Sequence, residues 1–223
     1  MVTRRPARRS CADRRRSGSG RLRAGHKLHP TATIREPHDG RQPASHADRP
    51  LRFSRAGETH FYGRRIWREV GNTEVVVGQL ASLVEVNVYR IVPVEPYPAD
   101  YEQTVAQNVR EQDADARPRI GDPLPDLAAY DRVVLASRIR YVRPPMIMRT
   151  FTEALDFAGT TVHPLTTHAG GGLGWAVEVY RQACRGAVFG EGLAVRGEEA
   201  ADAEPRVRAW LERIGLLAER GVG

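Results

Sequence analysis

The part of the chain with regular strand and helix patterns begins with the stretch Phe53-Ser54-Arg55-Ala56-Gly57, which is followed after a loop by Gly71-Asn72-Thr73. An apolar helical pattern begins directly after it. A strand that ends at small and hydroxyl residues and leads into a helix brings unpaired backbone N–H groups and a positive helix end together. This arrangement suits an anion such as phosphate. The same residue types also form ordinary turns and helix caps, so the segment alone leaves both interpretations open.

Downstream, apolar strand patterns alternate with amphipathic helix patterns. We expect strands at 51–53, 86–92, 132–136, 161–167 and 187–195, and helices at 73–83, 100–112, 146–157, 175–183 and 205–214. In the second helix Tyr101, Val105 and Val109 share one stripe, and Trp210 lies on the apolar face of the last helix. Strands that alternate with helices form a parallel sheet covered on both faces, because each right-handed crossover needs a helix. The sequence therefore predicts an α/β fold with a five-stranded parallel sheet.

Polar or glycine-rich segments follow the first, third and fourth strands. They begin at Ser54, Ser137 and Thr167, and the last runs into Gly170-Gly171-Gly172. In open parallel sheets, ligands bind beyond the carboxyl ends of the strands, where the strand order reverses. All three segments lie at that edge, which favours an anion site over ordinary turns.

The basic character of the chain comes from its front segment. Residues 1–50 hold 13 Arg and Lys against 4 Asp and Glu, a net charge of +9, whereas residues 51–223 hold 21 against 23, a net charge of −2. The front segment lacks apolar periodicity, and we expect a disordered, Arg-rich arm. One hypothesis is that the reading upstream of about Phe53 is not native to the working protein. The near-neutral body gives no reason to expect a specific nucleic-acid partner.

The body, residues 51–218, fits one domain with its own core. Its longest apolar-rich run, from Val75 to Val88, is too short and too polar to span a bilayer, so we expect no membrane association. Cys11 and Cys184 offer neither a disulfide framework nor a cysteine-based metal site, and a reducing cytoplasm is the natural compartment. The sequence contains no motif of a hydrolase or a nucleotide triphosphatase.

The body also carries an ordered series of short motifs. They are Ser54 to Gly57 with Gly71 to Thr73, Pro93 to Tyr101, Tyr130-Asp131, Pro145 to Phe151, Thr167-His168 with Gly172-Leu173-Gly174, and Glu191 to Gly197. As a series they resemble the flavodoxin-like proteins of bacteria, over roughly residues 51–216. The resemblance implies FMN as the cofactor, the strand order 2-1-3-4-5, and an insertion at 58–70 inside the phosphate loop.

The resemblance also implies which residues surround the cofactor. The residues around the FMN phosphate would be Ser54, Arg55, Ala56, Gly71, Asn72 and Thr73. The residues that flank the flavin ring would be Ser137, Arg138, Ile139, Arg140 and Tyr141 after the third strand, and Thr167, His168, Ala169, Gly170 and Gly174 after the fourth. Such proteins pass electrons through the flavin to a redox partner protein or a small-molecule acceptor, and the protein positions and tunes the cofactor.

Three features depart from the family pattern. The first strand keeps little of the expected apolar run, because Pro50 and Arg52 disfavour a central ladder position. Arg140 replaces the Trp that usually stacks on the flavin, which removes an aromatic platform of about 1 kcal/mol. Arginine can still stack on a planar ring, and its charge is expected to raise the flavin potential. The glycine loop also lacks a hydroxyl that the family often carries.

Two functions stay open on these grounds. The first is an FMN-binding electron-transfer protein or flavin-dependent reductase, as a monomer or homodimer. The second is a flavodoxin-like module with a degraded cofactor site, either a non-redox binding domain or a decaying gene product. His60 and His168 are either proton donors or ordinary hydrogen-bonding side chains, and we assign no catalytic residue. Phe61, Tyr62 and Trp67 either cover the flavin or a partner, or pack the insertion onto the domain.

Overall fold

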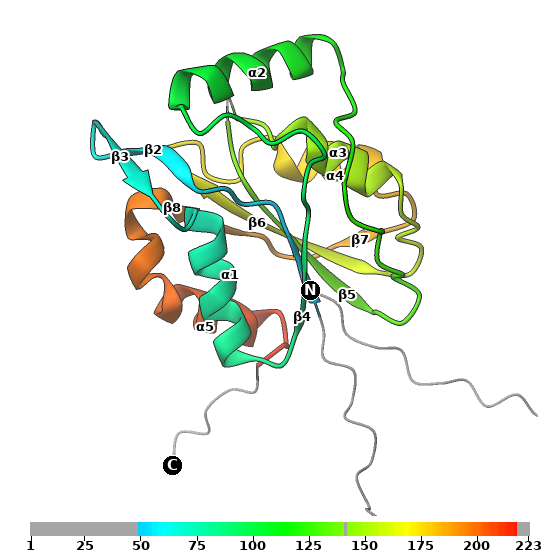
Figure 1. The fold of residues 1–223 in the computed structure, drawn as a ribbon. Helices are drawn as coiled ribbons and strands as arrows, with labels where there is room; N and C mark the ends of the chain where they lie inside the picture. Colours follow the sequence, from blue (N-terminus) through cyan, green and yellow to red (C-terminus); the bar gives the residue numbers. More distant parts are fainter. Residues whose placement is uncertain (1–48, 141, 218–223) are drawn as a thin grey trace, which may run out of the picture. The chain divides into compact units, whose positions relative to one another are not determined.

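The computed structural model describes residues 49–140 and 142–217, and it has the α/β architecture with a parallel sheet that the sequence predicts (Figure 1). The arm predicted for residues 1–50 lies almost entirely outside this part. Within the described part, six strands form the sheet, where five were predicted. In spatial order they are β4 (Asn87–Arg90), β1 (Arg49–Arg52), β5 (Arg132–Arg138) and β6 (Thr161–His168), with β7 (Val188–Phe189) and β8 (Leu193–Arg196) both paired with β6. Two further strands, β2 (Gly57–Phe61) and β3 (Arg64–Arg68), form a separate hairpin.

β1 occupies the middle of the sheet although it contains Pro50 and Arg52. It begins two residues earlier than predicted and pairs in parallel with β4 on one side and β5 on the other. Nη2 of Arg52 lies 2.9 Å from Oε1 of Glu74, in the helix that follows. This ion pair offsets the cost of placing a charged side chain in a central strand, which the sequence alone could not reveal.

The fifth strand predicted at 187–195 forms two strands, β7 and β8, because two residues of the neighbouring strand β6 prevent continuous pairing. Pro164 of β6 has no N–H to donate on the side that faces the fifth strand. His163 beside it donates from Nδ1 to Glu191 O at 3.0 Å, and its ring fills the space where a side chain on Gly190 would lie. The chain therefore leaves the ladder between β7 and β8.

Helices cover both faces of the sheet, as a buried parallel sheet requires (Figure 1). α1 and α5 lie on one face, whereas α3 and α4 lie on the other, with α2 beside α3. The helices are α1 (Asn72–Leu83), α2 (Tyr101–Asp113), α3 (Met146–Glu153), α4 (Ala176–Ala183) and α5 (Glu204–Arg213), and the 3₁₀ segment η1 (Gly197–Asp202) precedes α5.

The core consists of two apolar layers, one on each face of the sheet. Alternate residues of β5 serve both layers, because successive side chains of a strand point to opposite faces. Val133 and Leu135 pack with α3 and α4, whereas Val134 and Ala136 pack with α1 and α5. All four side chains are fully buried, and so is Trp210 of α5, as its place on the apolar face predicts.

α2 buries a polar face, so the predicted apolar stripe is not its contact surface. Val109 of that stripe is exposed, whereas Thr104 and Asn108 are buried. Oγ1 of Thr104 donates to the carbonyl oxygen of Pro98 at 2.6 Å, and Nδ2 of Asn108 donates to the carbonyl oxygen of Thr104 at 2.7 Å. These local hydrogen bonds satisfy the Thr104 hydroxyl and the amide nitrogen of Asn108, which favours their burial, whereas Oδ1 of Asn108 has no hydrogen-bond partner among the described residues.

The insertion predicted at 58–70 folds as the β2–β3 hairpin. Tyr62 and Gly63 form its two-residue turn, and both have positive φ angles, 45° and 79°, as a type I′ turn requires. Tyr62 and Trp67 are 64% and 55% exposed. The interpretation that these two aromatic side chains pack the insertion onto the domain is therefore wrong.

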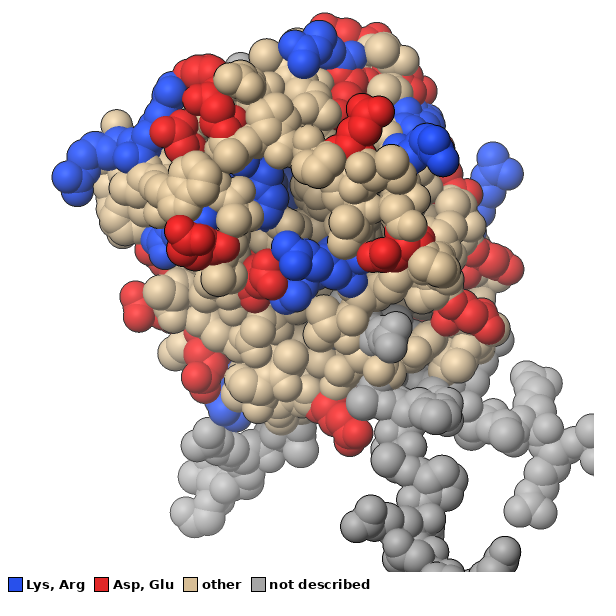
Figure 2. Space-filling model, in the orientation of Figure 1, with Lys and Arg blue, Asp and Glu red and all other residues tan. Residues whose placement is uncertain are grey.

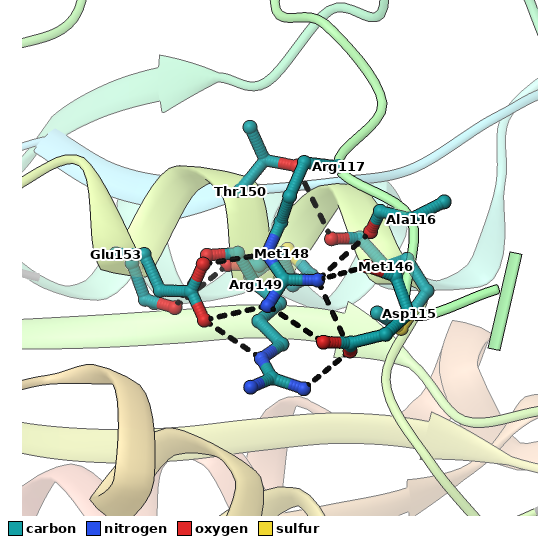
Figure 3. A network of polar contacts seen from close by, with 9 residues as sticks. Asp115, Ala116, Arg117, Met146, Met148, Arg149, Thr150 and Glu153 are labelled. Carbon is teal, nitrogen blue, oxygen red and sulfur yellow. Dashed lines mark hydrogen bonds and ion pairs between the residues drawn. The ribbon is translucent and has the colours of Figure 1, made fainter.

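Four charged side chains hold the loop after α2 against α3 (Figure 3). Arg117 and Arg149 approach the carboxylate of Glu153 with their Nε atoms, at 2.5 and 2.7 Å. Nη1 of Arg149 also lies 2.6 Å from Oδ1 of Asp115. This network joins two segments that flank the sheet and thereby fixes the loop.

Candidate functional site

A pocket of about 440 Å³ lies at the carboxyl ends of β1, β5 and β6. The loops after these strands, the first turn of α1, the β2–β3 hairpin and the start of α2 line it. Figure 2 shows basic side chains set back in a hollow on this side of the molecule. The volume is within the range of small-molecule sites in proteins, about 300–1,000 Å³.

Twelve of the sixteen residues predicted for the site line this pocket. They are Ser54, Arg55, Gly71, Asn72 and Thr73 around the start of α1, Arg138, Ile139 and Arg140 at the end of β5, and Thr167, His168, Ala169 and Gly170 at the end of β6. The three segments that the sequence places at one edge of the sheet thus meet in one cavity.

Three of the other predicted residues do not line the pocket. Ala56 is exposed, and Ser137 is fully buried with its hydroxyl oxygen 3.0 Å from a tyrosine hydroxyl of α4. Gly174 packs against the backbone of Val142. The prediction for Tyr141 lies outside the described residues.

Ser54 caps α1 from outside the helix. The residue before the helix, Gly71, has no side chain to act as a cap, and Oγ of Ser54 accepts the N–H of Glu74 at 3.2 Å instead. Gly71 is required here, because a Cβ atom on it would lie 2.3 Å from Oγ of Ser54. Since the Ser54 oxygen acts as the acceptor, its O–H stays free to donate to a ligand at the positive end of α1.

Buried polar groups form the floor of the pocket. The hydroxyl oxygens of Thr73 and Thr167 lie 2.7 Å apart, and both side chains are buried. One hydroxyl donates to the other, which leaves one O–H available. Oδ1 of Asn72 is buried and has no hydrogen-bond partner among the described residues. The floor therefore offers one donor and one acceptor to a ligand.

The loops after β5 and β6 are fastened to each other. The N–H of Ile139 donates to the carbonyl oxygen of Thr167 at 2.9 Å, and the N–H of Trp175 donates to that of Val142 at 2.7 Å. Val142 has a φ angle of 58°, which is strained for a β-branched residue. A Cβ atom on Gly174 would lie 2.4 Å from the Val142 carbonyl oxygen. Strain held by such close packing concentrates at ligand sites.

Four guanidinium groups, those of Arg55, Arg68, Arg138 and Arg140, line the pocket. Arg140 is 6% exposed, and its Nη1 and Nη2 have no hydrogen-bond partner in the described part of the chain. Nη1 of Arg55 donates to the carbonyl oxygen of Ala99 at 2.9 Å, but Nε and Nη2 of Arg55 are unpaired within the same part. Burial, together with the neighbouring guanidinium charges, lowers the pKa of Arg138 to about 9 and that of Arg140 to about 10. Buried cations without partners are costly, so the pocket is suited to an anion.

The sequence did not predict the wall that the hairpin and α2 contribute. This wall consists of Gly57, Glu58, Thr59, His60 and Arg68 from the hairpin, and Tyr101, Glu102 and Val105 from α2, while Val142, Gly171 and Gly197 complete the lining. Oε2 of Glu58 accepts the N–H of Tyr101 at 3.2 Å, which holds the hairpin against α2. Asp100 signals the start of α2 as its N-cap, but no local pattern places that helix over the pocket.

A comparison with protein families identifies the fold around this pocket. The family model for flavodoxins matches residues 66–214, which is more than half of the chain. The chain belongs to the flavodoxin family. The match begins within β3, so the first strand of this flavodoxin, β1, lies before the matched residues. No curated protein matches the chain.

Solved structures have the same fold as this flavodoxin. A protein assigned as a flavoprotein from Bacteroides uniformis has a TM-score of 0.58 and 24% identity, over 74% of this chain and 98% of its own. A protein of the same assignment from Bacteroides eggerthii has a TM-score of 0.60 and 23% identity, over 76% and 98%. A flavoprotein from Lactobacillus acidophilus, whose structure is a complex with FMN, has a TM-score of 0.50 and 14% identity, over 71% and 99%.

Two histidines line the pocket of this flavodoxin, His60 and His168. Burial lowers the pKa of His168, and the charges of Arg196 and Arg206 lower it further, so this imidazole is neutral at neutral pH. Nδ1 of His168 has no hydrogen-bond partner among the described residues, whereas Nδ1 of His60 lies 3.8 Å from Oε1 of Glu198. The ring of His168 is therefore able to bind a ligand.

The described residues contain neither a cluster of metal ligands nor a membrane-spanning helix. Within 49–140 and 142–217, no three His, Cys, Asp or Glu side chains are grouped so that they could hold a metal ion. No helix in this part of the flavodoxin is both long and apolar enough to cross a membrane.

Proposed function

We propose that the pocket binds FMN and that the protein acts as an electron-transfer protein or a flavin-dependent reductase. The observation that carries the proposal is the meeting of three strand ends, the positive end of α1 and unpaired guanidinium groups in one cavity. Ligands of open parallel sheets bind at this edge. Membership of the flavodoxin family and the FMN complex of the Lactobacillus acidophilus relative support the choice of ligand.

The residues at the start of α1 fit a phosphate group. Ser54 keeps a free O–H, and the first N–H groups of α1, at Asn72 and Thr73, have no acceptor within the helix. Nε and Nη2 of Arg55 are buried and unpaired among the described residues, and they offer two charged donors. Oδ1 of Asn72 would accept a hydrogen bond from a hydroxyl of the ribityl chain.

The loops after β5 and β6, which are joined by backbone hydrogen bonds, fit the flat flavin ring. A side chain on Gly170 would meet open space, so the backbone there is accessible to a ligand. Ile139 and Val142 lie beside the neighbouring Gly171 and supply apolar surface, and Arg140 supplies positive charge. Bound FMN would supply the electron transfer itself, whereas these residues hold the ring, exclude water and set the local charge.

The strand order 2-1-3-4-5 belongs to the same proposal. We take β7 and β8 together as the fifth strand, interrupted opposite Pro164. This places β1, the strand that leads into the phosphate loop, next to the point where the strand order reverses. We also propose a cytoplasmic protein that exchanges electrons with a redox partner or a small-molecule acceptor.

Titration of FMN into the purified protein tests the proposal, with quenching of flavin fluorescence as the readout. We expect the protein to bind FMN, and Ser54→Ala to weaken the affinity about tenfold, because it removes one hydrogen bond to a charged group. Ser82→Ala is the matched control, since Ser82 is exposed and donates to Gln79 O far from the lining. Absence of FMN binding by the parent protein would favour a non-redox binding module instead.

A further inference from the structure

The pocket contains more positive charge than one phosphate group requires. Arg55, Arg68, Arg138 and Arg140 line it, against Glu58 and Glu102. Glu102 is engaged by a fifth arginine, Arg65 of the hairpin. The phosphate site proposed above uses Arg55 and the positive end of α1, so the guanidinium groups at the end of β5 are left without an anion.

Of these guanidinium groups, that of Arg140 is held in place through contacts of both its backbone and its side chain. Its backbone is fixed by paired hydrogen bonds with Arg143, at 2.9 and 3.0 Å, and its guanidinium carbon lies 5.3 Å from the centroid of the Tyr101 ring. Arg140 is only 6% exposed, and so more than nine-tenths buried, yet neither Nη1 nor Nη2 has a hydrogen-bond partner in the described part of the chain. A buried, stacked guanidinium with two free nitrogens is pre-organised for a planar, bidentate acceptor.

Arg138 lies close enough to Arg140 for their charges to interact. Its Nη2 donates to Oγ1 of Thr59 at 3.2 Å, which fixes the side chain from the hairpin. The interaction between the two guanidinium charges helps lower the pKa of Arg138, after the larger effect of burial. A bound anion would relieve this repulsion, and the surrounding Ile139, Val105 and Val142 would contact an apolar ligand body.

We propose that Arg138 and Arg140 bind the carboxylate of a small organic substrate. A carboxylate presents two coplanar oxygens, which match the free fork of Arg140. The apolar lining beside the fork suits a ligand with a flat or aliphatic body. The proposal rests on the proposed function in one respect: the carboxylate would hold the substrate beside the flavin. The binding site itself does not depend on FMN.

Calorimetric titration with benzoate tests the site, on the FMN-free protein and on the FMN-loaded protein. We expect benzoate to bind both forms and benzamide, its uncharged analogue, to bind neither. Arg140→Gln should weaken benzoate binding about 10- to 100-fold, because hydrogen bonds to charged groups contribute that range. Arg181→Gln is the matched control, since its guanidinium also stacks on an aromatic ring, that of Phe189, but does not line the pocket.

The outcomes separate this inference from the FMN proposal. Benzoate binding that FMN abolishes would mean that Arg140 serves the cofactor, which overturns the carboxylate site and supports the flavin. Benzoate binding that depends on Arg140 in a protein that does not bind FMN would support the carboxylate site and overturn the flavin. Equal affinity for benzoate and benzamide, or no benzoate binding, overturns the inference. If Arg140→Gln does not fold, Arg140→Lys keeps the charge without the fork and should still weaken binding.

Discussion

The hydroxyl oxygens of Thr73 and Thr167 lie 2.7 Å apart and join the first turn of α1 to the end of β6. Both side chains are buried, so replacing one leaves the other without a partner. We expect Thr73→Val, which keeps the side-chain shape, to lower the free energy of unfolding by about 1–3 kcal/mol. Urea denaturation followed by circular dichroism measures the change.

Thr150→Val is the matched control for this bond. The hydroxyl of Thr150 is only half-buried, and its contact with the carbonyl oxygen of Met146 is long, at 3.4 Å. A loss below about 0.5 kcal/mol is therefore expected. Equal decreases in the free energy of unfolding of the two variants would mean that the hydrogen bond between α1 and β6 does not stabilise the fold more than the contact of Thr150 does.

The sequence predicted the edge of the sheet at which the pocket lies, because strand ends carry local signals. Ser54 and Thr167 each stand at the end of a predicted strand, and the chemistry of strand ends does not depend on distant residues. The wall formed by Tyr101 and Glu58 was not predictable in the same way. Their meeting depends on a hydrogen bond between segments that are 43 residues apart in the chain.

The sheet itself shows the same limit. The place of the half-buried Arg52 in a central strand depends on Glu74 in the next helix, and the break between β7 and β8 depends on Pro164 of a neighbouring strand. In both cases the residue that decides the outcome lies on another element. A pattern of apolar residues along one segment carries no information about such partners.

Arg140 should tune the potential of a bound flavin. A buried positive charge near the ring stabilises the negative charge that reduction brings, so the parent protein should have a higher potential than Arg140→Trp. We expect a difference on the order of 30 mV, which is about 1.4 kcal/mol for a two-electron couple. Redox titration of the FMN-loaded proteins measures it, and equal potentials would contradict the assignment of Arg140 to the ring side. Benzoate should reduce the difference if it neutralises the same guanidinium.

The network of Figure 3 should make a pH-dependent contribution to stability. The hydrogen bond from Arg117, followed by that from Arg149, lowers the pKa of Glu153 below its ordinary value. A lowered pKa in the folded state stabilises the protein above the unfolded pKa, and this stability is lost as the pH falls through the folded pKa. Glu153 is 36% exposed, so solvent screening limits the effect of Glu153→Gln to at most about 1 kcal/mol. Thermal unfolding should show the difference at neutral pH and none in acid.

Val142 and Gly174 should respond in opposite directions to substitution. Val142 has a φ angle of 58°, which asparagine adopts at much lower cost, so Val142→Asn should raise the free energy of unfolding by about 1 kcal/mol. Gly174→Ala should lower it by more, because the new Cβ atom would lie 2.4 Å from the Val142 carbonyl oxygen. Urea denaturation separates the two. Destabilisation by Val142→Asn would mean that the side-chain contacts of Val142 outweigh its backbone strain. The FMN affinity of the same variant would then show whether the Val142 side chain also contacts the ligand.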